Sequence, residues 1–245
     1  MQDEEDEFFK VIKILRKHKA PTVIPFIPLP EVDSDSEGES TELADPPFEA
    51  TVISPPNSPL TVYLGSVSDA MYPAALKARN ITAVINMAGR QCRDVQRIQK
   101  FSADEATSQW DRIAFSAEWY RAHAHVERYL VVDAEDHPRY RIVGDFELCL
   151  DWLAEAETKN SGAVLVHCMQ GLNRSAAVCA AWLSRRFEID TASAAEMIAS
   201  KRPGVLSNRG FVRQLIQFRL PKIQHEEKKE TPKIVDIGNI VERFP

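Results

Sequence analysis

One stretch of the chain places a cysteine between an apolar run and a helix-forming run: Ala163-Val164-Leu165-Val166-His167-Cys168-Met169-Gln170-Gly171-Leu172-Asn173-Arg174-Ser175. Its first four residues predict a short buried strand, and the alanine-rich residues 176–183 predict a helix. The spacing from Cys168 to Ser175 is C-x2-G-x2-R-S. A buried strand, a tight loop and a helix N-terminus therefore meet at a thiol.

The loop between the strand and the helix has the features of an anion-binding site. It is long enough to curl so that its amide N–H groups point inward at a helix N-terminus, which suits a phosphate dianion. Gly171 allows backbone geometry that a Cβ would obstruct, and the Arg174 guanidinium holds two phosphate oxygens at once. The expected phosphate-binding residues are Met169, Gln170, Gly171, Leu172, Asn173 and Arg174.

The same positive field favours the thiolate of Cys168. Cysteines at helix N-termini or beside cations have pKa values of roughly 3.5–7.5 rather than about 8.5. A thiolate beneath a bound phosphate is placed for in-line attack on phosphorus, which gives a phosphocysteine. We expect Ser175 to hydrogen-bond the sulfur and help it leave, and His167 to orient the loop rather than act as a base.

The loop resembles the signature of cysteine-dependent protein phosphatases, and four other segments resemble the dual-specificity branch of that superfamily. They are Thr61–Ser66 and Ile81–Ala88, similar to two early strands, Tyr129–Asp136, similar to the general-acid segment, and Lys201–Phe211, similar to the turn before the last helix. The resemblance spans residues 50–221. It implies a phosphatase fold and activity toward phosphorylated protein.

A phosphate ester also needs its leaving oxygen protonated as the bond to phosphorus breaks. Three acids compete for this role in one segment: Asp133, Glu135 and Asp136. Asp133 directly follows an apolar run, whereas Asp136 lies farthest out, before Pro138, which keeps the loop open. Spacing leaves the choice open, and the resemblance selects Asp136 as the acid and later as the base that activates water.

Asn173 departs from the family pattern, because many dual-specificity phosphatases carry serine there. Asn-Arg at this place also resembles the loop of RNA 5′-triphosphatases, which cut a phosphoanhydride whose leaving group needs little protonation. The presence of Asp136 argues for ester hydrolysis. The sequence has neither the Trp-Pro-Asp acid loop nor the phosphotyrosine-recognition loop of the long tyrosine-specific phosphatases. A shallower pocket is implied, open to phosphotyrosine and phosphoserine/threonine alike.

Length and composition suit one catalytic domain with extensions, or at most a second very small unit, and 44% hydrophobic residues supply a core. A net charge of −6 gives no reason to expect nucleic-acid binding. The four cysteines form no C-x2-C pair and have no zinc-ligand spacing, so we expect no metal and no cofactor. A reactive thiol needs a reducing compartment, and no apolar run nears about 18 residues. We therefore expect a cytoplasmic or also nuclear protein with no membrane span.

The alternation of predicted strands and helices indicates an α/β fold, a mainly parallel sheet of about five strands flanked by helices. Strands are expected at 50–54, 61–65, 81–87, 129–132 and 163–167. The first two are predicted to pair as a hairpin, those at 81–87 and 129–132 to be central, and the last to be innermost. Helices are expected at 69–78, 139–158, 175–187, 191–199 and 208–219, with Pro73 at a helix start or break.

Three segments accompany the domain predicted at 50–221. Residues 89–128 form an insertion for which a helical cover competes with a rim that recognises acidic or phosphorylated surfaces. Residues 1–49 are expected to be a largely flexible acidic extension, and residues 222–245 a C-terminal extension. The basic run at 16–19 with the aliphatic residues after it resembles short motifs that bind mitogen-activated kinases, and a solvated tail is the alternative.

The leading hypothesis is a metal-independent phosphatase that hydrolyses phosphotyrosine and phosphoserine/threonine in proteins. Cys168 is the predicted nucleophile, Arg174 the phosphate clamp, Asp136 the acid and Ser175 the group that assists thiolate release. One alternative is a phosphatase for a non-protein substrate, an RNA 5′-triphosphate or a phosphoinositide. Another is a non-catalytic scaffold that binds phosphate.

Overall fold

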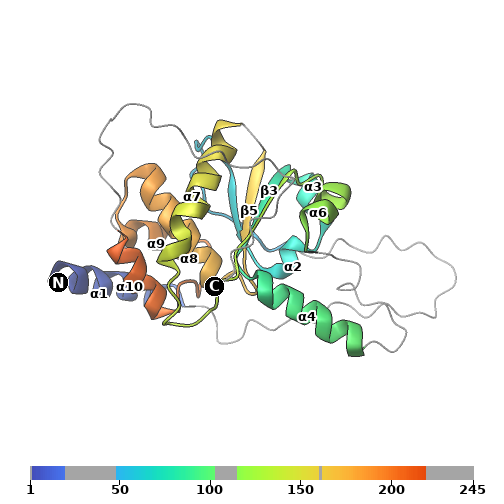
Figure 1. Ribbon diagram of the computed structural model, residues 1–245. Coiled ribbons are helices and arrows are strands. Elements are labelled where there is room, and N and C mark those ends of the chain that lie inside the picture. The colour runs from blue at the N-terminus through green and yellow to red at the C-terminus, as the bar shows by residue number, and fades with distance from the viewer. Residues whose placement is uncertain (1, 20–47, 103–114, 160–161, 219–245) are drawn as a thin grey trace.

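The computed structural model describes residues 2–19, 48–102, 115–159 and 162–218 (Figure 1). Within these ranges one five-stranded sheet has the strand order β1-β2-β5-β3-β4. Its strands are β1 (Thr51–Val52), β2 (Val62–Gly65), β3 (Ile81–Asn86), β4 (Arg128–Val131) and β5 (Ala163–His167). β1 and β2 pair antiparallel, and all other pairs are parallel. The predicted α/β fold class, the hairpin and the innermost strand are confirmed.

Helices cover both faces of the sheet (Figure 1). One face carries α7 (Val143–Thr158), α8 (Arg174–Phe187), α9 (Thr191–Ala199) and α10 (Arg209–Gln217). The other carries α2 (Val67–Ala70), α3 (Pro73–Ala78) and α6 (Ala117–Ala124). Side chains of β5 alternate between the two cores, with Val164 and Val166 in the larger and Leu165 in the smaller, as the two-residue period of a strand requires.

The helices begin where the sequence provides a start signal. Pro73 occupies the first turn of α3, where its missing N–H costs nothing, so the predicted helix start or break at Pro73 is confirmed. Asp190 caps α9 by accepting the Ser193 N–H at 2.6 Å. Asn208 caps α10 by accepting the Gly210 N–H at 3.1 Å. These caps fix the positions at which α9 and α10 enter the fold.

β4 lies at an edge of the sheet, so the prediction of a central strand at residues 129–132 is wrong. Its apolar residues are buried because helices cover its faces, and this burial does not require a strand on each side. Arg128 shows the cover from α7, since its guanidinium stacks 4.3 Å over the Trp152 ring and pairs with Glu155 at 2.8 Å. An apolar run of this length is therefore compatible with an edge position.

Residues 2–17 of the predicted flexible extension form helix α1 (Gln2–Lys17), which packs against α9 and α10 (Figure 1). Phe8 is 6% and Val11 0% exposed. Polar contacts surround them, including pairs of Glu5 with Arg213 at 2.6 Å and of Lys10 with Asp190 at 2.9 Å. Exposed ion pairs of this kind contribute little, so the buried apolar side chains hold the helix. This segment differs from the expectation because α9 and α10 offer it an apolar surface.

The predicted insertion is helical where the structure describes it, with α4 (Gly89–Ser102) followed by α6. Trp119 and Tyr120 of α6 pack on the smaller core, and the Tyr120 hydroxyl donates to the Ala70 carbonyl at 3.0 Å. Arg90 and Arg97 of α4 are exposed, as expected for a helical cover. Arg93 instead pairs with Asp133 at 2.7 Å, which ties α4 to the segment that follows β4.

Several sequence predictions concern residues outside the described ranges. These are residues 20–47 of the predicted acidic extension, which include most of the kinase-docking motif, and the extension at 222–245. They stay predictions, as do the domain boundaries. None of the helices in the described part of the chain combines the length and the apolar composition of a membrane-spanning segment.

The packing of α1 can be tested with two neighbouring phenylalanines. Phe8→Ala is expected to lower the free energy of unfolding by roughly 3 kcal/mol, because it empties a buried site against α10. Phe9 is 64% exposed, so Phe9→Ala is the matched control and is expected to change it by less than about 0.5 kcal/mol. Urea denaturation followed by circular dichroism measures both variants. Equal losses would contradict the packing of α1 on the domain.

Candidate active site

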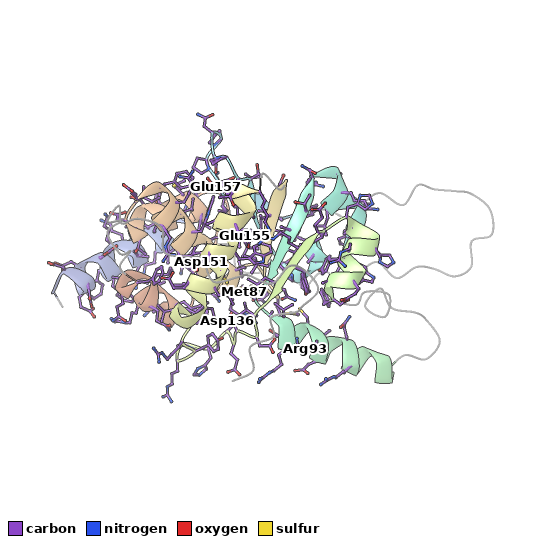
Figure 2. The ribbon with its side chains drawn as sticks, turned by 45° about the horizontal axis from the view of Figure 1, so that its top comes forward. Met87, Arg93, Asp136, Asp151, Glu155 and Glu157 are labelled. Carbon is purple, nitrogen blue, oxygen red and sulfur yellow. The ribbon has the colours of Figure 1, made fainter. Side chains whose placement is uncertain are left out.

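The loop that follows β5, residues 168–174 and here called the cysteine loop, leaves the sheet at the carboxyl ends of its parallel strands. Cys168 is 1% exposed, and α8 begins at Arg174. The Met87 N–H donates to the His167 carbonyl at 2.8 Å and joins the ends of β3 and β5. Figure 2 shows Arg93 and Asp136 along this edge, with Glu155 and Glu157 of α7 farther from it. Open α/β sheets bind ligands at this edge.

The carbonyl groups of the cysteine loop are tied to the surrounding protein. Met169 O accepts the Val67 N–H at 3.2 Å, and Leu172 O accepts the Leu206 N–H at 2.8 Å. The Arg202 side chain donates to the two carbonyls in between, with Nη2 3.3 Å from Gln170 O and Nε 3.0 Å from Gly171 O. Four successive carbonyls of the loop therefore face outward.

The outward carbonyls determine where the loop amides point. The described residues contain no cis peptide bond, and in a trans peptide the C=O and the next N–H point in opposite directions. The N–H groups of residues 170–173 therefore face the concave side of the loop. Gly171 confirms this orientation, because its N–H lies 3.3 Å from Cys168 Sγ. Four of the six predicted phosphate-binding residues, 170–173, thus have N–H groups on the side of the loop where Cys168 Sγ lies, and their role in binding phosphate stays a prediction.

Gly171 is required by this geometry for two reasons. Its φ of +69° lies in the left-handed region that side chains disfavour. A Cβ at this position would also lie 2.5 Å from the Gly65 carbonyl oxygen. The close approach of the loop to the end of β2 therefore needs a residue without a side chain.

Arg174 is 4% exposed, and hydrogen bonds hold one nitrogen of its guanidinium in place. Its Nη1 donates to Gln91 Oε1 at 3.0 Å and to the Ala134 carbonyl at 3.1 Å. Its Nε is buried and has no acceptor among the described residues. A buried donor left without an acceptor costs about 1–3 kcal/mol, so this group is ready to bind an anion.

Cys168 differs from the other cysteines in the direction of its pKa shift. Burial acts to raise its pKa, but the charge of Arg174, the Ser175 hydroxyl at 3.2 Å and the N–H groups of Ser175 and Gly171 outweigh burial and lower the pKa. Burial raises the pKa of Cys92 to about 12, and it also raises the pKa of Cys149 and Cys179. Cys168 is therefore the thiol that ionises most readily.

His167 is fully buried, and its burial lowers its pKa to about 3. The imidazole is therefore neutral at physiological pH. A neutral ring behind the loop is compatible with the predicted orienting role, which stays a prediction.

The three acids after β4 have different contacts. Asp133 pairs with Arg93 of α4, and Glu135 Oε1 lies 3.7 Å from Arg90 Nη1. Asp136 contacts the cysteine loop, since Asn173 Nδ2 donates to its Oδ2 at 3.0 Å. Spacing left three candidates, and the structure brings the carboxyl group of Asp136 to the loop.

Three contributors to the site had no predicted role: Gln91, Arg202 and Asn208. Gln91 comes from the insertion, and the other two come from residues 201–208, here called the late turn. Arg202 appeared in the sequence only as part of a family-like segment. Its contact with the loop carbonyls depends on the packing of α9 beside α8, for which a single sequence carries no local signal.

Alkylation of Cys168 tests the charge of its thiol. We expect its rate with iodoacetamide to be full above the lowered pKa and to fall as pH drops through it, with a midpoint below about 8.5. Ser175→Ala removes a hydrogen bond to the thiolate and is expected to raise the midpoint by about one pH unit. Ser200→Ala, on the exposed end of α9, is the control. Mass spectrometry of the Cys168 peptide measures the rate, and a wild-type midpoint above about 8.5 would contradict the assignment.

Comparisons with known proteins agree with this geometry. The family model described as "Dual specificity phosphatase, catalytic domain" matches residues 62–220. Dual specificity protein phosphatase 1 of Arabidopsis thaliana is 29% identical over 154 residues, which are 63% of this chain and 63% of that protein. Human dual specificity protein phosphatase 26 is 35% identical over 89 residues, which are 36% of this chain and 42% of that protein.

A solved structure shows the same fold. The crystal structure of human DUSP28 matches with a TM-score of 0.50 and 26% identity, covering 70% of this chain and 93% of that chain. The chain spans less than two thirds of the length of the curated relatives named above. The family model nevertheless matches more than half of this chain. The chain therefore belongs to the dual specificity phosphatase family.

Proposed function

We propose that the chain is a protein phosphatase that hydrolyses phosphotyrosine and phosphoserine/threonine esters through a phosphocysteine intermediate. One observation carries the proposal: a buried thiol of lowered pKa lies in a loop whose amides face it, 3.3 Å from the Gly171 N–H. Amides at a helix N-terminus bind a phosphate dianion, and here they would hold it over a nucleophile.

In the first step the Cys168 thiolate attacks phosphorus in line with the ester oxygen. The S–P bond forms and the P–O bond breaks, and the protonated Asp136 carboxyl gives its proton to the leaving oxygen. In the second step the Asp136 carboxylate takes a proton from water, whose oxygen attacks phosphorus. The S–P bond then breaks, and the thiolate and inorganic phosphate are released.

The other site residues stabilise the negative charge on the phosphoryl oxygens and on the sulfur in these steps, or support the loop. The amides of residues 170–173 and the free Arg174 donor stabilise the phosphoryl oxygens, and preorganised donors usually give the largest single contribution to catalysis. Ser175 Oγ, 3.2 Å from Cys168 Sγ, donates to the sulfur as it leaves in the second step. His167 supports the strand end from which the loop departs.

The side chains of the loop favour a simple phosphate ester as substrate. Met169, Gln170 and Leu172 carry no positive charge for the extra phosphates of a phosphoinositide headgroup. An RNA 5′-triphosphate has a phosphate leaving group that needs little protonation. The contact of Asp136 with the loop supports a reaction that uses an acid, which is ester hydrolysis.

The partner that follows from this function is a phosphorylated protein. A cytoplasmic or nuclear location suits the activity, because the thiolate must stay reduced. Kinase docking through the N-terminal extension stays a prediction. Of its basic run, Lys17 and His18 pair with Glu196 of α9, so docking would have to compete with these contacts or use other residues.

The nucleophile is tested with Cys168→Ser on an aryl phosphate and a phosphopeptide panel, with a chelator present. We expect kcat to fall by more than about 10⁴-fold, because serine is not ionised at neutral pH. Cys179→Ala removes a buried thiol of raised pKa and is the matched control, expected to stay active. An inactive wild type under reducing conditions, or an active Cys168→Ser, would overturn the proposed function.

The acid is tested with Asp136→Ala, which is expected to lower kcat for phosphoserine peptides by about 10²–10⁴-fold. Glu135→Ala changes an exposed carboxylate of the same segment and is expected to keep kcat within about threefold. The same variants are assayed on RNA with a 5′-triphosphate end. Faster turnover of that RNA than of phosphopeptides, unaffected by Asp136→Ala, would favour the anhydride alternative.

A further inference from the structure

Two amide side chains hold the two oxygens of the Asp136 carboxyl group. Asn173 Nδ2 donates to Asp136 Oδ2 at 3.0 Å, and Asn208 Nδ2 donates to Asp136 Oδ1 at 2.9 Å. Asn173 lies in the cysteine loop at the N-cap of α8, and Asn208 ends the late turn. Asp136 is therefore bonded at once to both segments, which are far apart in the sequence.

The orientation of both amides follows from their other bonds. Asn173 Oδ1 accepts the Asn208 N–H at 2.9 Å, and Asn208 Oδ1 accepts the Gly210 N–H at 3.1 Å. A backbone N–H can only donate, so the oxygen of each amide must face it. The NH₂ group of each side chain is then left for Asp136, and neither amide can be flipped without losing a bond.

Asn173 is used differently from an ordinary helix cap. It stands at the N-cap of α8, where asparagine usually accepts an N–H of the first turn. Its side chain makes no such bond and is committed to Asp136, the Ser207 hydroxyl and the Asn208 N–H. The helix start thus gives up a stabilising cap, and the acid gains a fixed contact with the cysteine loop.

The main chain beside Asp136 also rests on α10. A Cβ on Gly210 would lie 2.1 Å from the Pro138 carbonyl oxygen, so the backbones are in direct contact there. The Gln214 amide donates to the Tyr140 carbonyl at 2.8 Å and accepts the Val143 N–H at 3.2 Å. The two asparagines therefore act on a segment whose flank is already supported, and they determine the carboxyl position itself.

We propose that Asn173 and Asn208 form an amide clamp that positions Asp136 for proton transfer, an inference that rests on the proposed function. Each carboxyl oxygen has two lone-pair sites, so one amide on each oxygen leaves a site that carries the acidic proton in the first step and accepts a proton from water in the second. Serine at position 173 is too short to bond both Asp136 and the late turn. The asparagine that departs from the family pattern thus serves ester hydrolysis.

The clamp predicts a dependence on the leaving group. Protonation matters most when the leaving oxygen is basic, as in phosphoserine, and little for a phenol with strong electron-withdrawing substituents. A position that supported only the fold or phosphate binding would affect both kinds of substrate equally. The sensitivity of kcat to the leaving group therefore separates a positioning role from a structural one.

The experiment compares Asn173→Ser and Asn208→Ser in the full chain. Serine at 208 keeps a helix cap but does not reach Asp136, and serine at 173 is the residue many family members carry. Each variant is expected to lower kcat for a phosphoserine peptide by about tenfold. This is less than the whole general-acid contribution, because Asp136 is still present but less well positioned. Each is expected to lower kcat for an activated aryl phosphate several-fold less, because that leaving oxygen needs little protonation. Gln217→Ala removes an exposed amide from α10, the helix that Asn208 begins, and is the control.

A double-mutant cycle with Asp136→Ala completes the test. In that background the serine changes are expected to have no further effect, because the group they position is absent. Equal losses on both substrates, or full additivity with Asp136→Ala, would overturn the clamp while leaving the phosphatase function intact. A wild type inactive on the activated aryl phosphate would instead reject the proposed function.

Discussion

The site depends on the outward hydrogen bonds of the cysteine loop. Loop amides can face an anion only if the carbonyls of the same peptides find donors elsewhere, since buried polar groups without partners are costly. Here the donors come from the start of α2 through Val67 and from the late turn through Arg202 and Leu206. Residues distant in sequence therefore determine the shape of a loop that has no regular structure of its own.

Burial and charge oppose each other at the nucleophile. Burial is the largest cause of the raised pKa values of Cys149 and Cys179, whose thiols stay protonated. Cys168 is buried as deeply but ionises more readily, since Arg174 and the Ser175 hydroxyl lie beside it. A buried thiolate is also shielded from water, which strengthens each of these interactions. The reactivity of the cysteine thus depends on where Arg174 is held, and Gln91 and the Ala134 carbonyl hold it.

The local parts of this molecule could be predicted from sequence, and the contacts between distant parts could not. Apolar runs, Pro73 and the spacing around Cys168 specify strands, helix starts and the loop, because each signal lies within a few residues. The edge position of β4, the packing of α1 and the roles of Gln91 and Arg202 depend on which elements become neighbours. The spacing of Asp133, Glu135 and Asp136 left the choice of acid open for the same reason, since contacts with the distant Asn173 and Asn208 distinguish Asp136.

The late turn contacts both the loop that carries the proposed nucleophile and the segment that carries the proposed acid. Arg202 and Leu206 bond the loop that holds the nucleophile, while Asn208 bonds the acid. Leu206 has a φ of 56°, a left-handed conformation that costs a leucine about 1–2 kcal/mol, and its N–H donates to Leu172 O at 2.8 Å. A strained leucine persists only where its surroundings impose the conformation. Because one turn contacts both segments, the separation of thiol and carboxyl depends on that turn as much as on the segments that carry them.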